Sequence, residues 1–497
     1  MVYHVGHFIN GKKISGEQNP QLDLYNPALG QSIGKVALGR ENEVEQAVKA
    51  AKIAFPAWAE TPPIKRARIL FAFKERLQQE IENLAKLITE EHGKNIEDAK
   101  GSIWRGIELI EFFCGIPHLL TGTYSSQTAF QIDNYTFRQA VGIGVGITPY
   151  NFPVMVPIWM FIPAIACGNT FILKPSEKDP SPAFRLAEII HDSGLPEGVL
   201  NIVNGDKETV NQLITHPNVD LVSCVGSTPV AESIYQTAIC HGKRSQTFGG
   251  AKNHGVILPD ANIDFTAQAI ANAAYGSAGQ RCMAISVVVA VTDKVADKIV
   301  DKITKIAQSL IVGPGDNPKT EMGPLITKDH LEKVKNYIAL GVQEGAELVV
   351  DGRKLDLSQL AQGYYLGPSL FDHVTPKMKI YQEEIFGPVL MVLRVPSLED
   401  AIDLINQNPY GNGTAIFTRD GALANQFVQR VEVGMVGINV PIPVPVAYHS
   451  FGGWKKSFYG DLHLHAKESV TFYTKLKTVT ERWPNQPQQA SYTMPHE

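Results

Sequence analysis

One stretch of the sequence, from Gln139 to Leu173, contains no charged residue and is long enough to cross a membrane. Prolines at 149, 153, 157 and 163 and glycines at 142, 144, 146 and 168 interrupt it, and the polar pair Tyr150-Asn151 lies in its middle. Backbone groups left unpaired at such breaks would be costly in lipid. The stretch therefore predicts a strand, a loop, a helix and a second strand, all buried in a globular protein.

Short apolar runs alternate with helical patterns through most of the chain. The runs lie at 141–147, 170–173, 200–203, 221–225 and 255–258, and a second series lies at 285–292, 389–395, 413–417 and 435–440. Helices are expected between them, for example at 181–193, 294–310, 327–344 and 421–430. This alternation predicts parallel sheets, and 497 residues exceed what one hydrophobic core usually holds. The expected fold class is α/β, with two parallel-sheet domains.

The two ends of the chain follow other patterns. We expect helices at 43–58, at 64–92 with Gly93 near the end, and at 102–120. Residues 122–140 are polar with many β-formers, and residues 466–480 alternate as an edge strand would. The last residues, 484–497, are expected to be frayed.

Composition excludes several classes of function. The net charge of −5 and the absence of a basic run with interleaved aromatics argue against a nucleic-acid partner. The five cysteines form no C-x-x-C pair, which argues against a disulfide framework or a structural zinc site and favours a reducing compartment. The N-terminus has neither a secretory nor a transit pattern, so we expect a cytoplasmic protein without a membrane anchor.

The strongest candidate for chemistry is Cys282, in the stretch YGSAGQRCMAIS. A thiolate is the reactive form of cysteine, and a neighbouring cation such as Arg281 would favour it. Taken alone, a buried structural cysteine is an equally good interpretation. Four other motifs accompany it in order: TPYNFP (148–153), LKPSE (173–177), GSTPV (226–230) and EEIFGPV (383–389).

Together these motifs resemble the aldehyde dehydrogenase superfamily over essentially the whole chain. The stretches FGGAKNHGVILPDAN (248–262) and GDLHLHAKESVTFYTKLKTVTERW (460–483), with the Arg-Cys pair, look most like its CoA-acylating methylmalonate-semialdehyde dehydrogenases. The resemblance implies an NAD-binding domain over 1–121 and 141–247 and a catalytic domain over 248–460. It also implies an oligomerisation region over 122–140 and 461–497, in a homotetramer built as a dimer of dimers.

The resemblance also implies an NAD site. Its residues would be Thr148, Tyr150, Lys174, Glu177, Lys178, Gly226, Ser227, Gly249, Glu384 and Phe386. Gly226-Ser227 has independent support, because it follows a buried strand and opens a helix, where backbone N–H groups attract a pyrophosphate; a plain helix cap is the alternative. A carboxylate at 177 would repel a 2′-phosphate and so favours NAD over NADP.

Two patterns imitate other sites. Residues 141–146 read G-x-G-x-G after a valine and open onto a proline-rich loop, so we reject a dinucleotide fingerprint there. The segment Asp461-Leu-His463-Leu-His465 offers two histidines and an acid, but no third ligand cluster lies nearby in sequence, and we interpret it as an ordinary strand face without metal.

Asn151 is the expected oxyanion donor, and a turn-forming Asn before Phe-Pro is the alternative interpretation. The type of reaction depends on a second residue, which this sequence lacks. Hydrolytic members carry a glutamate that activates water, and Phe248 stands at its position, with no acid in TFGGAKN. Water, with a pKa near 15.7, needs such a base, whereas an alkyl thiol near 8.5 is partly ionised at neutral pH. Coenzyme A is therefore the expected acyl acceptor.

The expected reaction oxidises methylmalonate or malonate semialdehyde to a thioester on Cys282, with decarboxylation and release as propanoyl-CoA or acetyl-CoA. Arg105 and Arg281 would bind the substrate carboxylate. For Arg105 this role rests on the resemblance only, because without it the residue would be interpreted as a solvated arginine on a helix. Two alternatives stay open: a hydrolytic aldehyde dehydrogenase with another base, and a non-catalytic scaffold of the same fold.

Overall fold

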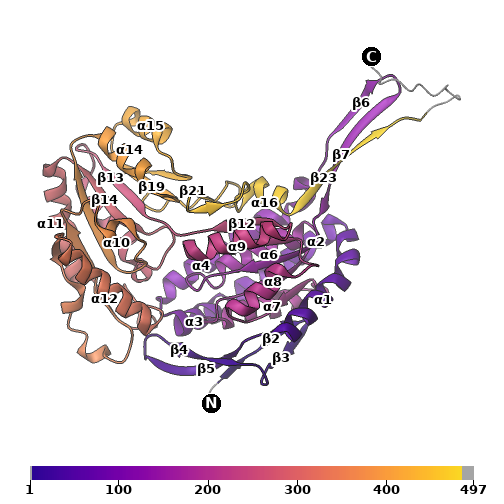
Figure 1. The fold of residues 1–497 in the computed structure, drawn as a ribbon, viewed down its shortest axis with the longest axis horizontal. Coiled ribbons are helices and arrows are strands. Elements are labelled where there is room, and N and C mark those ends of the chain that lie inside the picture. Colours follow the sequence, from indigo (N-terminus) through magenta and orange to yellow (C-terminus); the bar gives the residue numbers. More distant parts are fainter. Residues whose placement is uncertain (1–2, 484–497) are drawn as a thin grey trace.

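The computed structural model, which describes residues 3–483, has two α/β lobes and an arm of three strands that projects from the first lobe (Figure 1). Residues 1–2 and 484–497 lie outside the described residues; the expectation of a frayed end concerned 484–497. A small sheet of β1 (Tyr3–Val5), β5 (Gln31–Ala37) and β4 (Gln21–Asn26) lies along the first lobe. Two α/β lobes agree with the predicted fold class.

The first lobe contains an eight-stranded sheet. Its spatial order is β22 (Phe458–Tyr459), β12 (Arg244–Phe248), β11 (Leu221–Val225), β8 (Ile143–Ile147), β9 (Thr170–Lys174), β10 (Leu200–Ile202), β2 (His7–Ile9) and β3 (Lys12–Ile14). The strands from β12 to β10 are parallel, and β22, β2 and β3 join antiparallel at the two edges. The carboxyl ends of the parallel strands therefore meet at one edge, where nucleotides usually bind.

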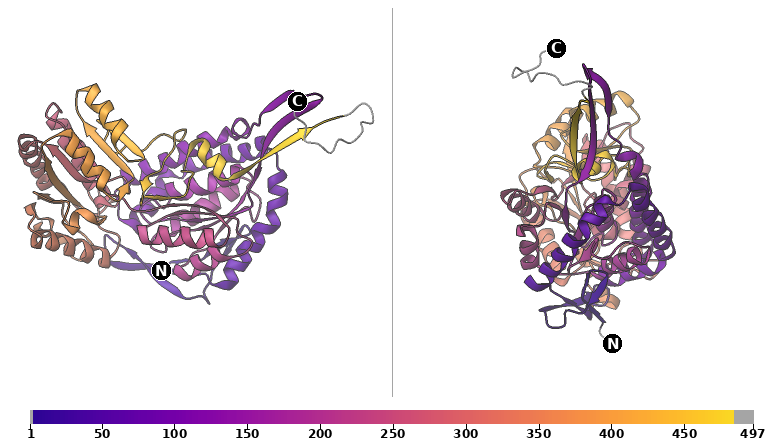
Figure 2. Two further views of the ribbon diagram at one scale, coloured as in Figure 1. Left: turned by 45° about the horizontal axis from the view of Figure 1, so that its top comes forward. Right: turned by 90° about the vertical axis from the view of Figure 1, so that its right-hand side faces the viewer.

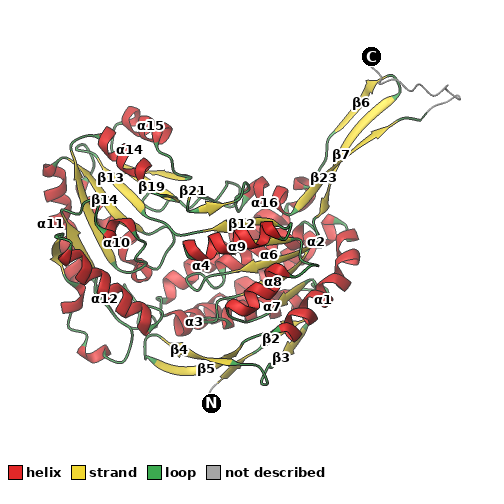
Figure 3. Cartoon of the chain, in the orientation of Figure 1, coloured by secondary structure: helices red, strands yellow, loops and turns green. Residues whose placement is uncertain are grey.

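Helices cover both faces of this sheet (Figure 3). They are α1 (Glu41–Glu60), α2 (Pro63–Gln79), α3 (Ile81–His92), α4 (Ile96–Cys114), α5 (Ile116–Leu119), α6 (Met155–Ala166), α7 (Ser181–Asp192), α8 (Lys207–Thr215) and α9 (Thr228–Cys240). Because side chains alternate along a strand, Phe171 and Leu173 of β9 pack into one hydrophobic core and Ile172 packs into the core on the other face. The sheet is thus buried on both sides, as expected for parallel strands.

The uncharged stretch forms β8, a loop, α6 and β9, which confirms the prediction of strand, loop, helix and strand. None of the helices within residues 3–483 is long and apolar enough to cross a membrane. The glycines of the rejected fingerprint serve packing. A Cβ on Gly144 or Gly146 would come within 2.8 or 2.7 Å of the Phe171 ring, so this strand needs glycine beside its large neighbour.

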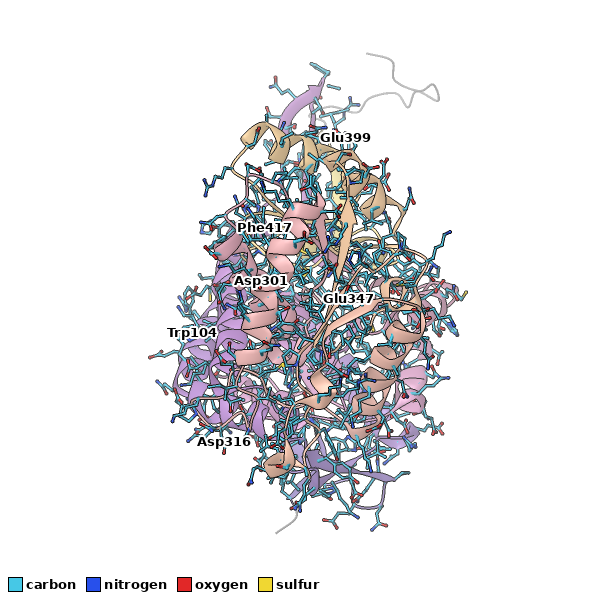
Figure 4. All side chains as sticks on the ribbon, turned by 90° about the vertical axis from the view of Figure 1, so that its left-hand side faces the viewer. Trp104, Asp301, Asp316, Glu347, Glu399 and Phe417 are labelled. Atoms are coloured by element: carbon cyan, nitrogen blue, oxygen red, sulfur yellow. The ribbon has the colours of Figure 1, made fainter. Side chains whose placement is uncertain are left out.

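The second lobe contains a seven-stranded sheet that is parallel except for one edge. Its order is β15 (Glu347–Val350), β16 (Ser369–Asp372), β17 (Val389–Val395), β14 (Ile285–Val291), β13 (Asn253–Ile257), β19 (Gly413–Phe417) and β20 (Met435–Ile438). Its helices are α10 (Ile263–Tyr275), α11 (Asp293–Ser309), α12 (Lys328–Gln343), α13 (Lys379–Gln382), α14 (Leu398–Gln407) and α15 (Gly421–Arg430). In the end view of this lobe, exposed acids such as Asp301 and Glu399 lie on the outer helices, whereas Phe417 is fully buried (Figure 4).

The arm consists of β6 (Tyr124–Ala129), β7 (Ile132–Ala140) and β23 (Thr474–Glu481), and it extends beyond both lobes (Figure 2). All eight residues of β23 pair antiparallel with β7, from Thr474 opposite Ala140 to Glu481 opposite Asp133. The prediction of extended chain at 122–140 is therefore confirmed. Strands β7 and β23, which are far apart in the sequence, lie side by side in the arm.

Three sequence predictions about elements were wrong. The expected helix at 64–92 is two helices that meet at Glu80, and the one at 102–120 is α4, which begins earlier, followed by the short α5. The run 466–480 is not one strand, because α16 (Ala466–Phe472) precedes β23. In the segment 461–473, which the resemblance assigns to the oligomerisation region, His465 lies against Trp159 of α6, with 4.4 Å between ring centroids; the assignment itself stays a prediction.

Candidate active site

The loop that carries Cys282 has an unusual backbone. Ser277 and Ala278 have φ values of +54° and +53°, a region that non-glycine residues rarely adopt, and Gly279 follows at +72°. A Cβ on Gly279 would overlap the main-chain oxygen of Gly387. The loop therefore packs directly against the segment EEIFGPV and brings Cys282 next to Glu384 and Phe386.

Two asparagines fix the main chain at the nucleophile. The side-chain amides of Asn253 and Asn412 donate to the carbonyl oxygen of Cys282 at 2.9 and 3.1 Å. Asn253 belongs to the stretch FGGAKN, so this stretch positions the cysteine although it supplies no acid. Cys282 also lines the main cleft of the site.

The electrostatics of the thiol differ from the sequence prediction. The guanidinium of Arg281 pairs with Asp98 of α4 at 2.6 Å, so this cation is already engaged. The pKa of the Cys282 thiol is raised to about 12, chiefly by burial and also by the charge of Glu384, while the backbone N–H groups and Lys94 act in the opposite direction. The expectation that Arg281 would make this thiol acidic is therefore wrong for the free protein.

Lys94 is a residue that the sequence analysis missed. Its side chain is 1% exposed, and Nζ donates to the main-chain oxygen of Asn151 at 2.6 Å and lies 4.3 Å from the centre of the Phe152 ring. Burial lowers the pKa of Lys94 to about 8. Lys94 follows α3 at the point where Gly93, with φ +91°, ends the helix, and only this helix-end pattern marked the region in the sequence.

A cleft of about 300 Å³ joins Cys282 to the carboxyl edge of the first sheet. Nine of the predicted residues line it: Tyr150, Asn151, Lys178, Gly226, Ser227, Gly249, Cys282, Glu384 and Phe386. His330 and Lys333 of α12 line it as well, and no motif in the sequence pointed to them. Nε2 of His330 donates to the main-chain oxygen of Phe386 at 2.7 Å, which ties α12 to that loop.

The predicted NAD residues that do not line the cleft lie beside it. Lys174 ends β9 and pairs with Glu177 at 2.9 Å, and this pair holds the pKa of Glu177 below its usual range although burial opposes the shift. The hydroxyl of Thr148 is buried without a partner among the described residues. Helix α9 begins after Ser227 without a side-chain cap, so its first N–H groups are free for a phosphate. These donors and the cleft fit a dinucleotide.

Phe248, at the position where hydrolytic members have glutamate, is 5% exposed and packs on Phe458, with 4.9 Å between ring centroids. The acid that the fold brings to Cys282 is Glu384 from the second lobe. One of its oxygens accepts from the N–H of Ala251 at 2.9 Å, and burial raises its pKa. The sequence placed no acid in this stretch, and the structure brings one there from a distant segment.

The two predicted substrate arginines have different surroundings. Arg281 lines a second, smaller cavity that also contains Cys282 and Glu384. Arg105 lies two helical turns after Asp98 on α4, pairs with Glu108 at 2.8 Å, and lines neither cavity around Cys282. Its role in substrate binding stays a prediction.

The rejected metal segment is not a plain strand face. His465 is buried between Trp159 and Phe451, and His463 contacts Ser450 and lies near Glu468. Within residues 3–483, no group of three potential ligands from His, Cys, Asp and Glu is arranged to hold a metal ion.

Comparison with known proteins decides the family. Residues 14–479 match the model of the aldehyde dehydrogenase family. The chain belongs to that family. The aldehyde dehydrogenase fold explains the two α/β lobes, the cleft between them and the arm.

Similar proteins cover almost the whole chain. A malonate-semialdehyde dehydrogenase from Pseudomonas aeruginosa is 53% identical over 96% of each sequence. The crystal structure of a methylmalonate-semialdehyde dehydrogenase from Oceanimonas doudoroffii is 52% identical, with a TM-score of 0.96 over 98% of this chain and 99% of that one. A Sinorhizobium meliloti aldehyde dehydrogenase relative, solved with NAD, is 51% identical, with a TM-score of 0.97 over 98% and 99%.

Proposed function

We propose that this aldehyde dehydrogenase oxidises methylmalonate semialdehyde and malonate semialdehyde with NAD, and transfers the acyl group, after loss of CO2, to coenzyme A. The observation that carries the reaction type is Phe248, packed on Phe458 where a hydrolytic member has its glutamate. The observation that supports the substrate is identity of about half over nearly the full length to relatives with these names.

The residues of the cleft suit a covalent mechanism. The thiolate of Cys282 would attack the aldehyde carbon, and the side-chain amide of Asn151 with the N–H of Cys282 would hold the resulting oxyanion. Asn151 is 3% exposed, and Lys94 anchors its main-chain oxygen, so the backbone that carries the amide is held in place before the reaction. Such a donor typically contributes about 2.7 to 4 kcal/mol to lowering the barrier.

NAD would be held by Lys174, Glu177, the Gly226-Ser227 end of α9 and Glu384, and when bound it would supply the hydride acceptor. The carboxylate of Glu177 lies beside Lys174 and would disfavour the 2′-phosphate of NADP. The uncapped N-terminus of α9 would take the pyrophosphate.

Oxidation leaves a thioester on Cys282. In the thioester from either semialdehyde a carboxylate lies β to the thioester carbonyl, so loss of CO2 gives an enolate that the thioester delocalises. Protonation of the enolate carbon then gives the propanoyl or acetyl thioester. Arg281, beside the nucleophile and oriented by Asp98, is the cation we assign to the substrate carboxylate, with Arg105 as a second candidate. The thiol of coenzyme A would then release propanoyl-CoA or acetyl-CoA and free Cys282.

We also propose a cytoplasmic homotetramer in which the arm joins subunits. The arm exposes large apolar side chains on its two outer strands, with Tyr124 of β6 exposing 65% and Leu476 of β23 exposing 57% of its surface. Such side chains are better placed in an interface between copies than in water.

The experiment that tests the covalent step compares the wild-type protein with Cys282→Ala. NADH formation from methylmalonate semialdehyde should disappear in the variant, while NAD binding, measured by quenching of protein fluorescence, should remain, because the proposed cofactor contacts lie elsewhere. Turnover retained by the variant would exclude Cys282 as the nucleophile.

A further inference from the structure

The proposed reaction contains a proton transfer for which the sequence offers no base. When a thiol attacks the thioester on Cys282, the S–H proton must leave, and Phe248 cannot accept it. An unassisted alkyl thiol, with a pKa near 8.5, is ionised to only a few per cent at neutral pH. A positioned base would therefore raise the rate of this step.

Glu384 is the acid among the described residues that line the two cavities around Cys282. Both Glu384 and Cys282 line both cavities, so Glu384 borders the space in which an acyl group on Cys282 and an incoming thiol would meet. The two groups also interact electrostatically, since the negative charge of Glu384 raises the pKa of the Cys282 thiol.

The carboxylate is held at one oxygen only. Oε1 accepts from the N–H of Ala251 at 2.9 Å. A Cβ on Gly250 would lie 2.6 Å from Oε2, so the glycine makes room for this second oxygen, which has no hydrogen-bond partner within residues 3–483. Lys252 fixes the loop from behind, donating to the main-chain oxygens of Ile380 and Glu383 at 2.6 and 2.7 Å.

This arrangement suits a base for a thiol. One oxygen anchors the group and the other is free to accept a proton. Because burial raises the pKa of Glu384 towards that of a thiol, proton transfer between them is better matched than with an exposed carboxylate.

We propose that Glu384 is the general base of acyl transfer to the thiol, a role that rests on the proposed CoA-acylating function and goes beyond a contact with the nicotinamide ribose. Oε2 takes the S–H proton as the thiol sulfur forms a bond to the thioester carbon. The tetrahedral intermediate then collapses, the bond between that carbon and Sγ of Cys282 breaks, and the proton on Glu384 passes to the released Cys282 thiolate.

The test separates this role from cofactor binding by leaving NAD out. Cys282 is acylated with 4-nitrophenyl propanoate, excess ester is removed, and thiolysis is followed with two thiols. Coenzyme A must lose a proton, whereas 4-nitrobenzenethiol is already ionised at neutral pH and needs no base. The variants are Glu384→Gln, Glu384→Asp and the matched control Glu383→Gln, whose carboxylate instead accepts from the Tyr337 hydroxyl at an exposed position.

Glu384→Gln should slow thiolysis by coenzyme A by about 100-fold, the lower range for a lost general base. With the ionised thiol it should slow by less than about threefold, and Glu384→Asp should retain more of the rate with coenzyme A than Gln does. Glu383→Gln should behave as wild type. Equal slowing with both thiols, no slowing with coenzyme A, or an Asp variant no better than Gln would overturn the proposal.

Failure of the proposed function would look different. In that case the wild-type acyl-enzyme itself would lose its propanoyl group to water as fast without coenzyme A as with it. The proposal about Glu384 fails only if wild-type thiolysis depends on coenzyme A and the variants show one of the contrary patterns.

Discussion

Replacing Lys94 by methionine should disturb the oxyanion donor without touching a reacting group. Lys94 is almost completely buried, and its Nζ holds the main-chain oxygen of Asn151 at 2.6 Å. Methionine fills a similar volume but cannot donate, so the segment that presents the Asn151 amide loses its anchor. Lys86→Met, at an exposed position on α3, is the matched control.

The structure sets the size of the effects on stability and on rate. The pKa of Lys94 falls from 10.5 to about 8 and each unit is about 1.36 kcal/mol, so at neutral pH the buried ammonium costs about 3 kcal/mol even with its hydrogen bond, and the variant should not lose stability near pH 7. For the rate, a hydrogen bond from a charged donor is worth about 1.5 to 3 kcal/mol. The rate of NADH formation should fall by roughly 10- to 150-fold, as the 1.5 to 3 kcal/mol is lost from the barrier-lowering geometry.

The pH dependence gives a second readout. Because the pKa of Lys94 is lowered in the folded protein, the unfolded chain binds more protons between about pH 8 and 10.5, and folding is favoured as the pH rises through that window. The melting temperature of wild type relative to Lys94→Met should therefore increase from pH 8 to pH 10. Thermal scans and stopped-flow NADH formation measure the two effects. Wild-type rates in Lys94→Met would refute the anchoring argument.

The other predictions concern selectivity, reactivity and packing. Arg281→Leu should reduce kcat/KM for methylmalonate semialdehyde relative to propanal by about 10- to 150-fold, and Arg105→Leu should do so less, because it lines neither cavity; equal losses on both aldehydes would contradict a carboxylate-binding role. Iodoacetamide should label Cys282 and the exposed Cys240, with activity lost only in step with Cys282, as peptide mass mapping would show. Labelling of the buried cysteines first would contradict the burial seen here. Gly146→Ala should destabilise the protein by about 1 to 3 kcal/mol through crowding of the neighbouring ring, seen as a lower melting temperature.

Local patterns in the sequence predicted the elements well where packing has a clear period. The uncharged stretch gave its strand, loop, helix and strand because apolar runs, prolines and glycines each have one good structural role there. The helix predicted at 64–92 failed at Glu80, because an apolar stripe continues across two helices that pack on the same core. The strand predicted at 466–480 failed because α16 is held by tertiary contacts to the first lobe.

The site was predictable only where a motif marks it. Cys282, Asn151 and the residues at Gly226 and Glu384 lie together in one cleft, as the order of motifs suggested. Lys94, Asp98, His330 and the engagement of Arg281 depend on which segments meet in space. Spacing in the sequence carries no signal for such long-range pairs.

The measurement that tests the central claim is product analysis with the wild-type enzyme, NAD and methylmalonate semialdehyde, with and without coenzyme A. Acyl transfer to a thiol predicts that steady NADH formation requires coenzyme A and that mass spectrometry finds propanoyl-CoA and CO2 in equal amounts. Free acid formed without coenzyme A, as fast as acyl-CoA forms with it, would contradict the account and would require a water-activating base.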